Sequence, residues 1–252
     1  MFEKEAVPLT AVWQDRIKGS WWKAPLIILA YFYLRVLLEL EVVKRGLANM
    51  PNSLSAEALL SGEGIMKAMA EAEIFYHLQA FILLGLVLLA VHLFKFKLFS
   101  FKELSRKGIL QIISLFVIFI LVQILFGQLI EWLIPGYEQP ENQTLLIQLM
   151  QNTHPIGMFI NIVILTPIIE EIICRGLIMK YTFSLMPVMG AFVSMVFFTL
   201  LHSPSNIGDF MIYFILAAGI TLVYWKSRKL EYAILFHMLQ NFLGFISICL
   251  LK

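Results

Sequence analysis

Two adjacent glutamates lie inside an otherwise apolar stretch, Thr166–Gly176, which reads TPIIEEIICRG. Each ionised acid near the centre of a bilayer costs about 2.5–3.5 kcal/mol on insertion scales, so it needs a partner or a function there. Arg175 follows Glu171 by four residues, the spacing at which two side chains meet on one helix face. We therefore predict that Glu171 and Arg175 form a supporting ion pair.

Glu170 has no such partner in its own helix. It points about 100° away from Glu171 around a helix axis. Pro167 lies just upstream and removes a backbone donor, which predicts a bend beside the acid. An unpaired acid next to a bend is a candidate general base. The alternative is a salt bridge at the cytoplasmic edge of the membrane, with the spare acid reaching water.

Three further polar side chains occur in the apolar segments that follow. His202, in FFTLLHS, comes four residues after Phe198, and FHMLQN supplies His237 and Asn241 at the same spacing. Taken singly, His202 could be a satisfied residue at a helix end, and the other two could bond to neighbouring helices or donate jointly to an oxyanion. Combined with Glu170, they fit a centre that activates water for hydrolysis.

The composition places these residues in a membrane protein. Of the 252 residues, 60% are hydrophobic and 14% are charged, whereas a soluble domain is near half apolar and a quarter charged. We predict a single integral membrane domain over residues 1–252. The chain has no long basic run and no nucleic-acid motif, so nucleic acid is excluded as a partner. Cys174 and Cys249 are interpreted as small apolar residues.

Seven apolar runs are long enough to position the polar residues at membrane depth, because about 20 helical residues cross the hydrocarbon core. Helices are the expected spans, since backbone groups in lipid must be satisfied within the segment. We therefore predict an all-α, polytopic transmembrane helical bundle of about seven spans. The predicted spans are roughly 24–43, 74–94, 108–134, 156–179, 187–202, 209–225 and 231–251.

Lysine and arginine in the short loops indicate the orientation. The loops after the second and sixth spans are basic, and those after the third and fifth have neither residue. This alternation predicts a cytoplasmic N-terminus and an external C-terminus. The loop 44–73 fits less well, because it should be external yet holds Lys44, Arg45 and Lys67. It leaves room for a surface helix.

The ordered set of motifs resembles a known family. Glu-Glu-x-x-x-Arg, then Phe-x-x-x-His, then His-x-x-x-Asn is similar to the pattern of the CPBP family, the CAAX-protease and bacteriocin-processing enzymes that are also called Abi proteins. The resemblance covers about 155–245, a motif-bearing core, and the first three spans carry no matching motif. The residues that carry it are Glu170, Glu171, Arg175, Phe198, His202, His237 and Asn241.

The resemblance implies an all-helical intramembrane endopeptidase. By analogy with the prenyl-protein proteases of the family, Glu170 would be the general base, helped by His202. His237 and Asn241 would stabilise the oxyanion of the tetrahedral intermediate. Glu171 and Arg175 would support the site.

Metal dependence has two readings. Glu170, His202 and His237 make a set that could bind catalytic zinc. The chain lacks a His-Glu-x-x-His helix, however, and no acid would remain as base, because Glu171 is expected to pair with Arg175. We therefore predict no cofactor, with zinc as the alternative.

The predicted topology places Glu170 in the cytoplasmic half and His202 near the external end. One bridging water requires the two to approach, and a separation above about 10 Å would refute the site. Either the fourth span is longer and Glu170 sits deeper, or the fifth helix is short and His202 lies inside the bundle. We predict a cavity here, lined in part by the polar residues 203–206.

The expected partners are the lipid bilayer and a hydrophobic peptide or membrane-protein substrate. The compact chain suggests a bacterial member of the family in the plasma membrane. The alternative function is a non-catalytic scaffold or a bacteriocin self-immunity protein, in which the motif residues only brace the bundle. A transporter has less support, because no paired broken helices occur in two matching halves.

Overall fold

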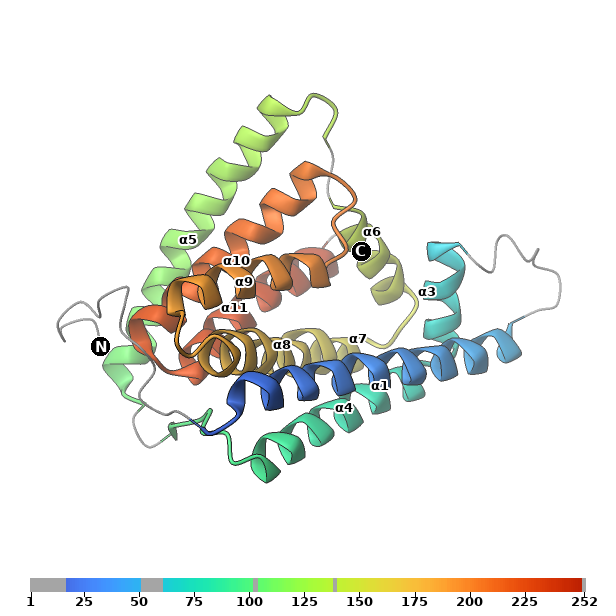
Figure 1. Cartoon of the computed structure of the whole chain (residues 1–252). Coiled ribbons are helices and arrows are strands. Elements are labelled where there is room, and N and C mark those ends of the chain that lie inside the picture. The colour runs from blue at the N-terminus through green and yellow to red at the C-terminus, as the bar shows by residue number, and fades with distance from the viewer. Residues whose placement is uncertain (1–16, 51–60, 102–103, 138–139, 251–252) are drawn as a thin grey trace.

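The structure is a computed structural model that describes residues 17–50, 61–101, 104–137 and 140–250. All regular structure in these residues is helical, so the all-α prediction is confirmed (Figure 1). The N-terminal segment 1–16, most of the loop after the first helix, Lys102 of the first basic loop and residues 138–139 lie outside the described residues. The elements are α1 (Ser20–Asn49), α3 (Gly62–Glu71), α4 (Glu73–Leu93), α5 (Arg106–Leu133), α6 (Glu141–Gln151), α7 (Pro155–Met158), η2 (Phe159–Leu165), α8 (Thr166–Glu171), η3 (Ile172–Thr182), α9 (Pro187–Leu201), α10 (Ile207–Ser227) and α11 (Leu230–Leu250).

Each predicted span corresponds to a helix. Five segments of the described chain are long and apolar enough to cross a membrane: α4, α5, the continuous run 155–182, α10 and α11. The helix α9 has only 15 residues, and α1 has 30 with charged side chains in its middle. The chain is therefore a multi-pass membrane protein, and the total of seven spans stays a prediction, as does the orientation.

Two short helices lie outside the predicted spans. The helix α3 falls in the loop 44–73, as the prediction of a surface helix there allowed, and Ser61 caps its first turn by accepting from Gly64 N. The helix α6 falls between the third and fourth predicted spans. The two pack against each other, and α3 also packs along α1.

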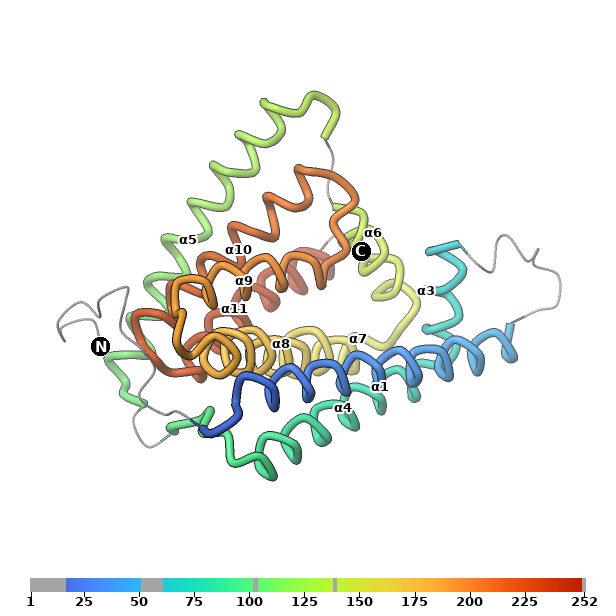
Figure 2. Tube along the Cα trace, in the orientation of Figure 1, coloured from blue at the N-terminus to red at the C-terminus, as the bar shows by residue number. Residues whose placement is uncertain are grey.

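The run from α7 to η3 lies at the centre of the bundle. It contacts α1 and α4 on one side and α9 and α11 on the other (Figure 1). In the tube view, α1 and α4 run side by side beneath it, and α5 extends along the opposite side of the molecule (Figure 2). The helix α5 packs mainly on α10 and α11 and exposes most of its apolar side chains, as a helix facing lipid does.

The most buried residues belong to the same central run. All side chains from Ile172 to Tyr181 are buried in η3, among them Cys174 and Arg175. Cys174 and Cys249 are both free thiols, in agreement with their interpretation as small apolar residues. The polar residues of the first motif are therefore held by the best-packed part of the fold.

The close contact between α1 and the surface helix α3 can be tested at Gly46. A Cβ at this position would lie 1.7 Å from the carbonyl oxygen of Ala68 in α3, so the two helices approach too closely for any side chain. We expect Gly46→Ala to lower the thermal unfolding midpoint of the detergent-solubilised protein, because backbone must move to accept the methyl group.

Gly85 of α4 supplies the matched control, because a Cβ there meets nothing within 4 Å. Gly85→Ala should leave the midpoint unchanged or raise it, since alanine favours a helix by up to about 1 kcal/mol over glycine. Equal midpoints for the two variants would contradict the close α1–α3 contact.

Candidate active site

The two glutamates end a short α-helical turn between two π-helical segments. The helix α8 has only six residues and is flanked by η2 and η3. Pro167 lies in its first turn, where the pattern changes from π to α. The predicted bend at Pro167 thus coincides with an irregularity in the hydrogen-bond ladder. π-Helical turns inside α-helices occur often at functional sites.

Glu171 and Arg175 form the predicted ion pair. Arg175 Nη1 lies 3.0 Å from Glu171 Oε1, and both side chains are fully buried. Arg175 Nη2 also donates to the carbonyl oxygen of Ala217 at 2.9 Å and to Thr221 Oγ1 at 3.2 Å. The guanidinium lies over the ring of Phe198 at 4.9 Å. Arg175 therefore ties the first motif to α9 and α10 as well as to Glu171.

His237 of α11 lies between the two acids, a contact that was not predicted. Its Nδ1 is 3.0 Å from Glu171 Oε1, and its Nε2 is 3.7 Å from Glu170 Oε2. Because a carboxylate oxygen accepts, Nδ1 carries a proton and donates to Glu171. The other ring nitrogen is thereby directed at Glu170, the same orienting arrangement that second partners impose on catalytic imidazoles.

Glu170 faces away from this buried pair, as its position in the helix predicts. Its contact with His237 is to another helix, and no partner within its own helix occurs in the described residues. The side chain is 16% exposed, whereas Glu171 has no exposure. Its Oε2 is buried and has no hydrogen-bond donor among the described residues. The two neighbouring acids thus occupy different environments.

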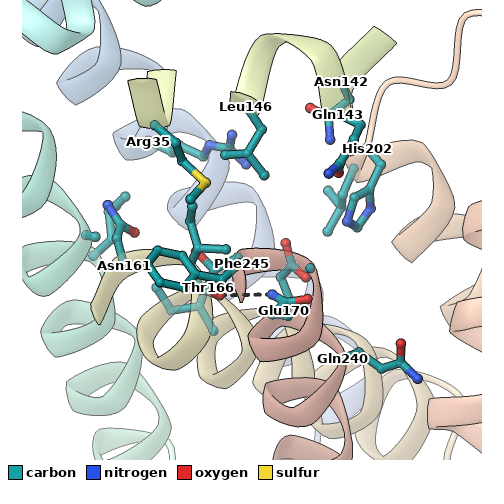
Figure 3. A pocket seen from close by; sticks show the side chains of 18 of the residues that line it. Arg35, Asn142, Gln143, Leu146, Asn161, Thr166, Glu170, His202, Gln240 and Phe245 are labelled. Carbon is teal, nitrogen blue, oxygen red and sulfur yellow. Dashed lines mark hydrogen bonds between the residues drawn. The ribbon is translucent and has the colours of Figure 1, made fainter. Parts of the chain in front are cut away.

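A cavity of about 400 Å³ opens beside Glu170, which confirms the predicted cavity. Glu170, His202 and Asn241 all line it, and they come from three different helical segments. Figure 3 shows the side chains of Glu170 and His202 directed into the same space. The short fifth helix resolves the difference in depth, because α9 ends at Leu201 and leaves His202 inside the bundle.

The loop after His202 does not line the cavity, so that part of the prediction was wrong. Its polar groups bond to the start of α10 instead. Asn206 caps that helix through Asp209 N, and Ser205 donates to the buried carboxylate of Asp209 through both its backbone N–H and its hydroxyl. The loop therefore fixes the end of α9 and so the position of His202.

His202 is held on two sides. Its Nδ1 lies 2.9 Å from the carbonyl oxygen of Phe198, so Nδ1 donates and Nε2 is left for another partner. The ring of Tyr213 stacks on the imidazole at 4.3 Å between centroids. Asn142 of α6 donates to the Tyr213 hydroxyl at 3.3 Å. The spacing of four residues therefore lets His202 contact Phe198 twice: its Nδ1 donates to the backbone carbonyl, and its ring lies 4.8 Å from the phenyl ring between centroids.

Asn241 and His237 do not share one environment. Asn241 lines the cavity and donates one amide hydrogen to the carbonyl oxygen of Ile162 in η2 at 2.9 Å. Its amide nitrogen has a second hydrogen to donate. His237 is only 1% exposed and does not line the cavity. Its Nε2 can reach a bound molecule only if the side chain of Glu170 moves aside.

Sequence reasoning missed the contribution of the first helix to the cavity. Tyr31, Arg35 and Glu39 follow one another at intervals of four on α1, and all three line it. That spacing was the available signal, because it places three polar side chains on one helix face. Further polar lining residues come from α4, α6 and α11: Tyr76, Gln79, Asn142, Gln143 and Gln240.

The alternative of a zinc site has no ligand set in the described residues. No group of three His, Cys, Asp or Glu side chains there is arranged to hold one metal ion. Glu170 and His202 line the cavity while His237 lies behind Glu170, so the three groups do not converge on one point in the cavity.

The buried ion pair between Glu171 and Arg175 can be tested by substitution. We expect Arg175→Met to destabilise the protein by about 3–5 kcal/mol, because it leaves the Glu171 carboxylate buried without its cation. The double variant Glu171→Leu/Arg175→Met should recover part of that loss, since it removes both charges. Thermal unfolding in detergent measures both effects, and additive losses would contradict the ion pair.

The matches to known proteins concern the segment that builds this site. Residues 152–243 match the model of a protein family described as type II CAAX prenyl endopeptidase Rce1-like. All seven motif residues fall within the match, whereas α1, α4 and α5 lie outside it. No curated protein and no solved structure matches the chain significantly. Over residues 152–243, the segment that carries the motifs, this chain is therefore similar to the Rce1-like type II CAAX prenyl endopeptidases.

Proposed function

We propose that this protein is an intramembrane endopeptidase that hydrolyses a peptide bond with water activated by Glu170 and His202. The observation that carries the proposal is the cavity that Glu170, His202 and Asn241 line together. Glu170 lies in α8, His202 directly follows α9, and Asn241 lies in α11, and all three are in the segment that matches a CAAX protease-type hydrolase.

In the proposed reaction, a water molecule is held between the carboxylate of Glu170 and Nε2 of His202. Glu170 takes a proton from it, and the water oxygen bonds to the substrate carbonyl carbon. The carbonyl oxygen becomes an oxyanion, which accepts the remaining N–H of Asn241. The intermediate then collapses, the C–N bond breaks, and the proton moves from Glu170 to the leaving nitrogen. The products are a carboxylic acid and an amine, and transfer of the acid proton to the amine gives a carboxylate and an ammonium group.

His237 is proposed to act on this centre in two ways. When Nε2 carries a proton as well as Nδ1, the imidazole is a cation that attracts and orients the Glu170 carboxylate, while Glu171 and Arg175 hold it from behind. Its predicted role as an oxyanion donor uses the same Nε2 proton, and it requires that the Glu170 side chain turn toward the substrate and expose the imidazole. Asn241, which already lines the cavity, needs no such movement.

The proposed substrate is a hydrophobic peptide or the exposed edge of a membrane protein, taken at the plasma membrane of a bacterium. Apolar helix faces around the site keep the protein in lipid, and the cavity supplies the polar surface that a peptide backbone needs. The alternative is a non-catalytic scaffold or immunity protein, for which the motif residues would serve packing alone.

Glu170→Ala separates these functions. We expect it to lower peptide-bond hydrolysis at least about a hundredfold, because the general base is lost. The measurement is mass spectrometry of secreted and membrane peptides from cells that carry either protein. Glu131→Ala, which alters an exposed acid of α5, is the control and should match the unchanged protein. Identical peptide profiles for Glu170→Ala and the control, at equal protein levels, would rule out the catalytic role.

Hydrolysis is also expected to continue in a strong chelator, because the proposed centre uses a carboxylate and an imidazole to activate water. The purified protein would be assayed before and after exhaustive chelation, with the protein returned to chelator-free buffer as control. Loss of activity that zinc restores would show that Glu170, His202 and His237 serve as metal ligands after all.

A further inference from the structure

The first helix brings a positive charge to the cavity. Arg35 lies in the middle of α1, and its side chain lines the same space as Glu170 and His202 (Figure 3). Among the described residues that line the cavity, Arg35 is the only arginine or lysine. It lies outside the segment that matches the family model. The arginine is therefore not part of the motif that the family model describes.

The contacts of Arg35 leave much of its guanidinium group unused. Glu39 Oε1 contacts Nε at 2.7 Å, and the guanidinium also hydrogen-bonds to the hydroxyl of Tyr31. A guanidinium has five N–H groups in a planar fork, so with these two partners it still has N–H groups to donate to the oxygens of a carboxylate.

A second pair on the same helix shows what a purely structural arginine does. Arg45 contacts Glu41 through both Nε and Nη2, each at 2.8 Å, and its guanidinium covers the ring of Phe75. That fork is occupied, and Arg45 does not line the cavity. Arg35 differs from Arg45 because its side chain lines the cavity.

Arg35 lies close to the two groups that are proposed to activate water. It is near enough to both Glu170 and His202 to act on each electrostatically. Glu39 is 31% exposed and can turn toward solvent when a stronger partner arrives. Tyr31 and Tyr76 line the cavity beside it and offer hydroxyl groups to the same partner. A bound anion would thus lie within the same cavity as the proposed hydrolytic centre.

We propose that Arg35 binds a carboxylate of the peptide substrate, with Glu39 as its counter-ion while the cavity is free. This inference rests on the proposed function, because it assigns part of the substrate to one wall of that site. The carboxylate is either the C-terminus of the peptide or an acidic side chain. In both cases Arg35 selects which peptides enter and fixes how far the scissile bond lies from the anchored group.

The test uses binding rather than cleavage. Full-length Glu170→Gln protein in detergent is titrated into a short fluorescein-labelled apolar peptide, prepared as free acid, as C-terminal amide, and as amide with one internal Glu or Gln. Fluorescence anisotropy gives the affinities. We expect a carboxylate to improve binding about tenfold or more over its neutral counterpart, as a charge-assisted hydrogen-bonded pair does.

Adding Arg35→Gln should abolish that preference, Arg35→Lys should keep part of it, and Arg45→Gln should leave it intact. Preference for the free acid over the amide identifies the C-terminus, and preference for Glu over Gln identifies a side chain. Each comparison is made within one variant, so partial misfolding cannot imitate the result. No preference in the parent protein, or one that survives Arg35→Gln, would overturn the inference. Selective binding without cleavage by the wild-type protein would refute only the proposed function.

Discussion

A single buried oxygen organises the centre of this molecule. Glu171 Oε1 accepts from Arg175 and from His237, which reach it from η3 and α11. Arg175 continues the connection to α10 and to the ring of Phe198 in α9. Five helical segments, α8, η3, α9, α10 and α11, are thus connected through this carboxylate and its arginine, and neither side chain has any contact with solvent. In so apolar an environment the loss of one partner leaves a costly charge, which makes the arrangement highly specific for one packing of the helices.

Much of this arrangement can be predicted from residue spacing. The intervals of four that relate Glu171 to Arg175, Phe198 to His202 and His237 to Asn241 each place two side chains on one helix face. Hydropathy alone located the helices that carry them. The separate environments of Glu170 and its neighbour also follow from helix geometry, because adjacent residues differ by about 100° around the axis. These are all local relations along one helix.

The relations between helices could not be predicted in the same way. Nothing in the spacing indicates that His237 lies behind Glu170 or that Tyr213 stacks on His202, since these contacts depend on how helices pack. The loop 203–206 was assigned to the cavity because it is polar, yet its polar groups are satisfied by Asp209 at the start of α10. Tyr31, Arg35 and Glu39 are spaced to lie on one face of α1. The sequence alone does not show whether that face lines a cavity or lies on the outer surface of the protein.

The order of the two acids along α8 has a consequence for how the chain can vary in length. Glu170 faces the cavity and Glu171 faces the interior only because of their angular positions on one short turn. Inserting or deleting one residue between Thr166 and Arg175 would rotate the cavity-facing acid into the buried network or carry the buried one into the cavity. Loops at the periphery have no such constraint. In this turn the number of residues therefore matters as much as their identity.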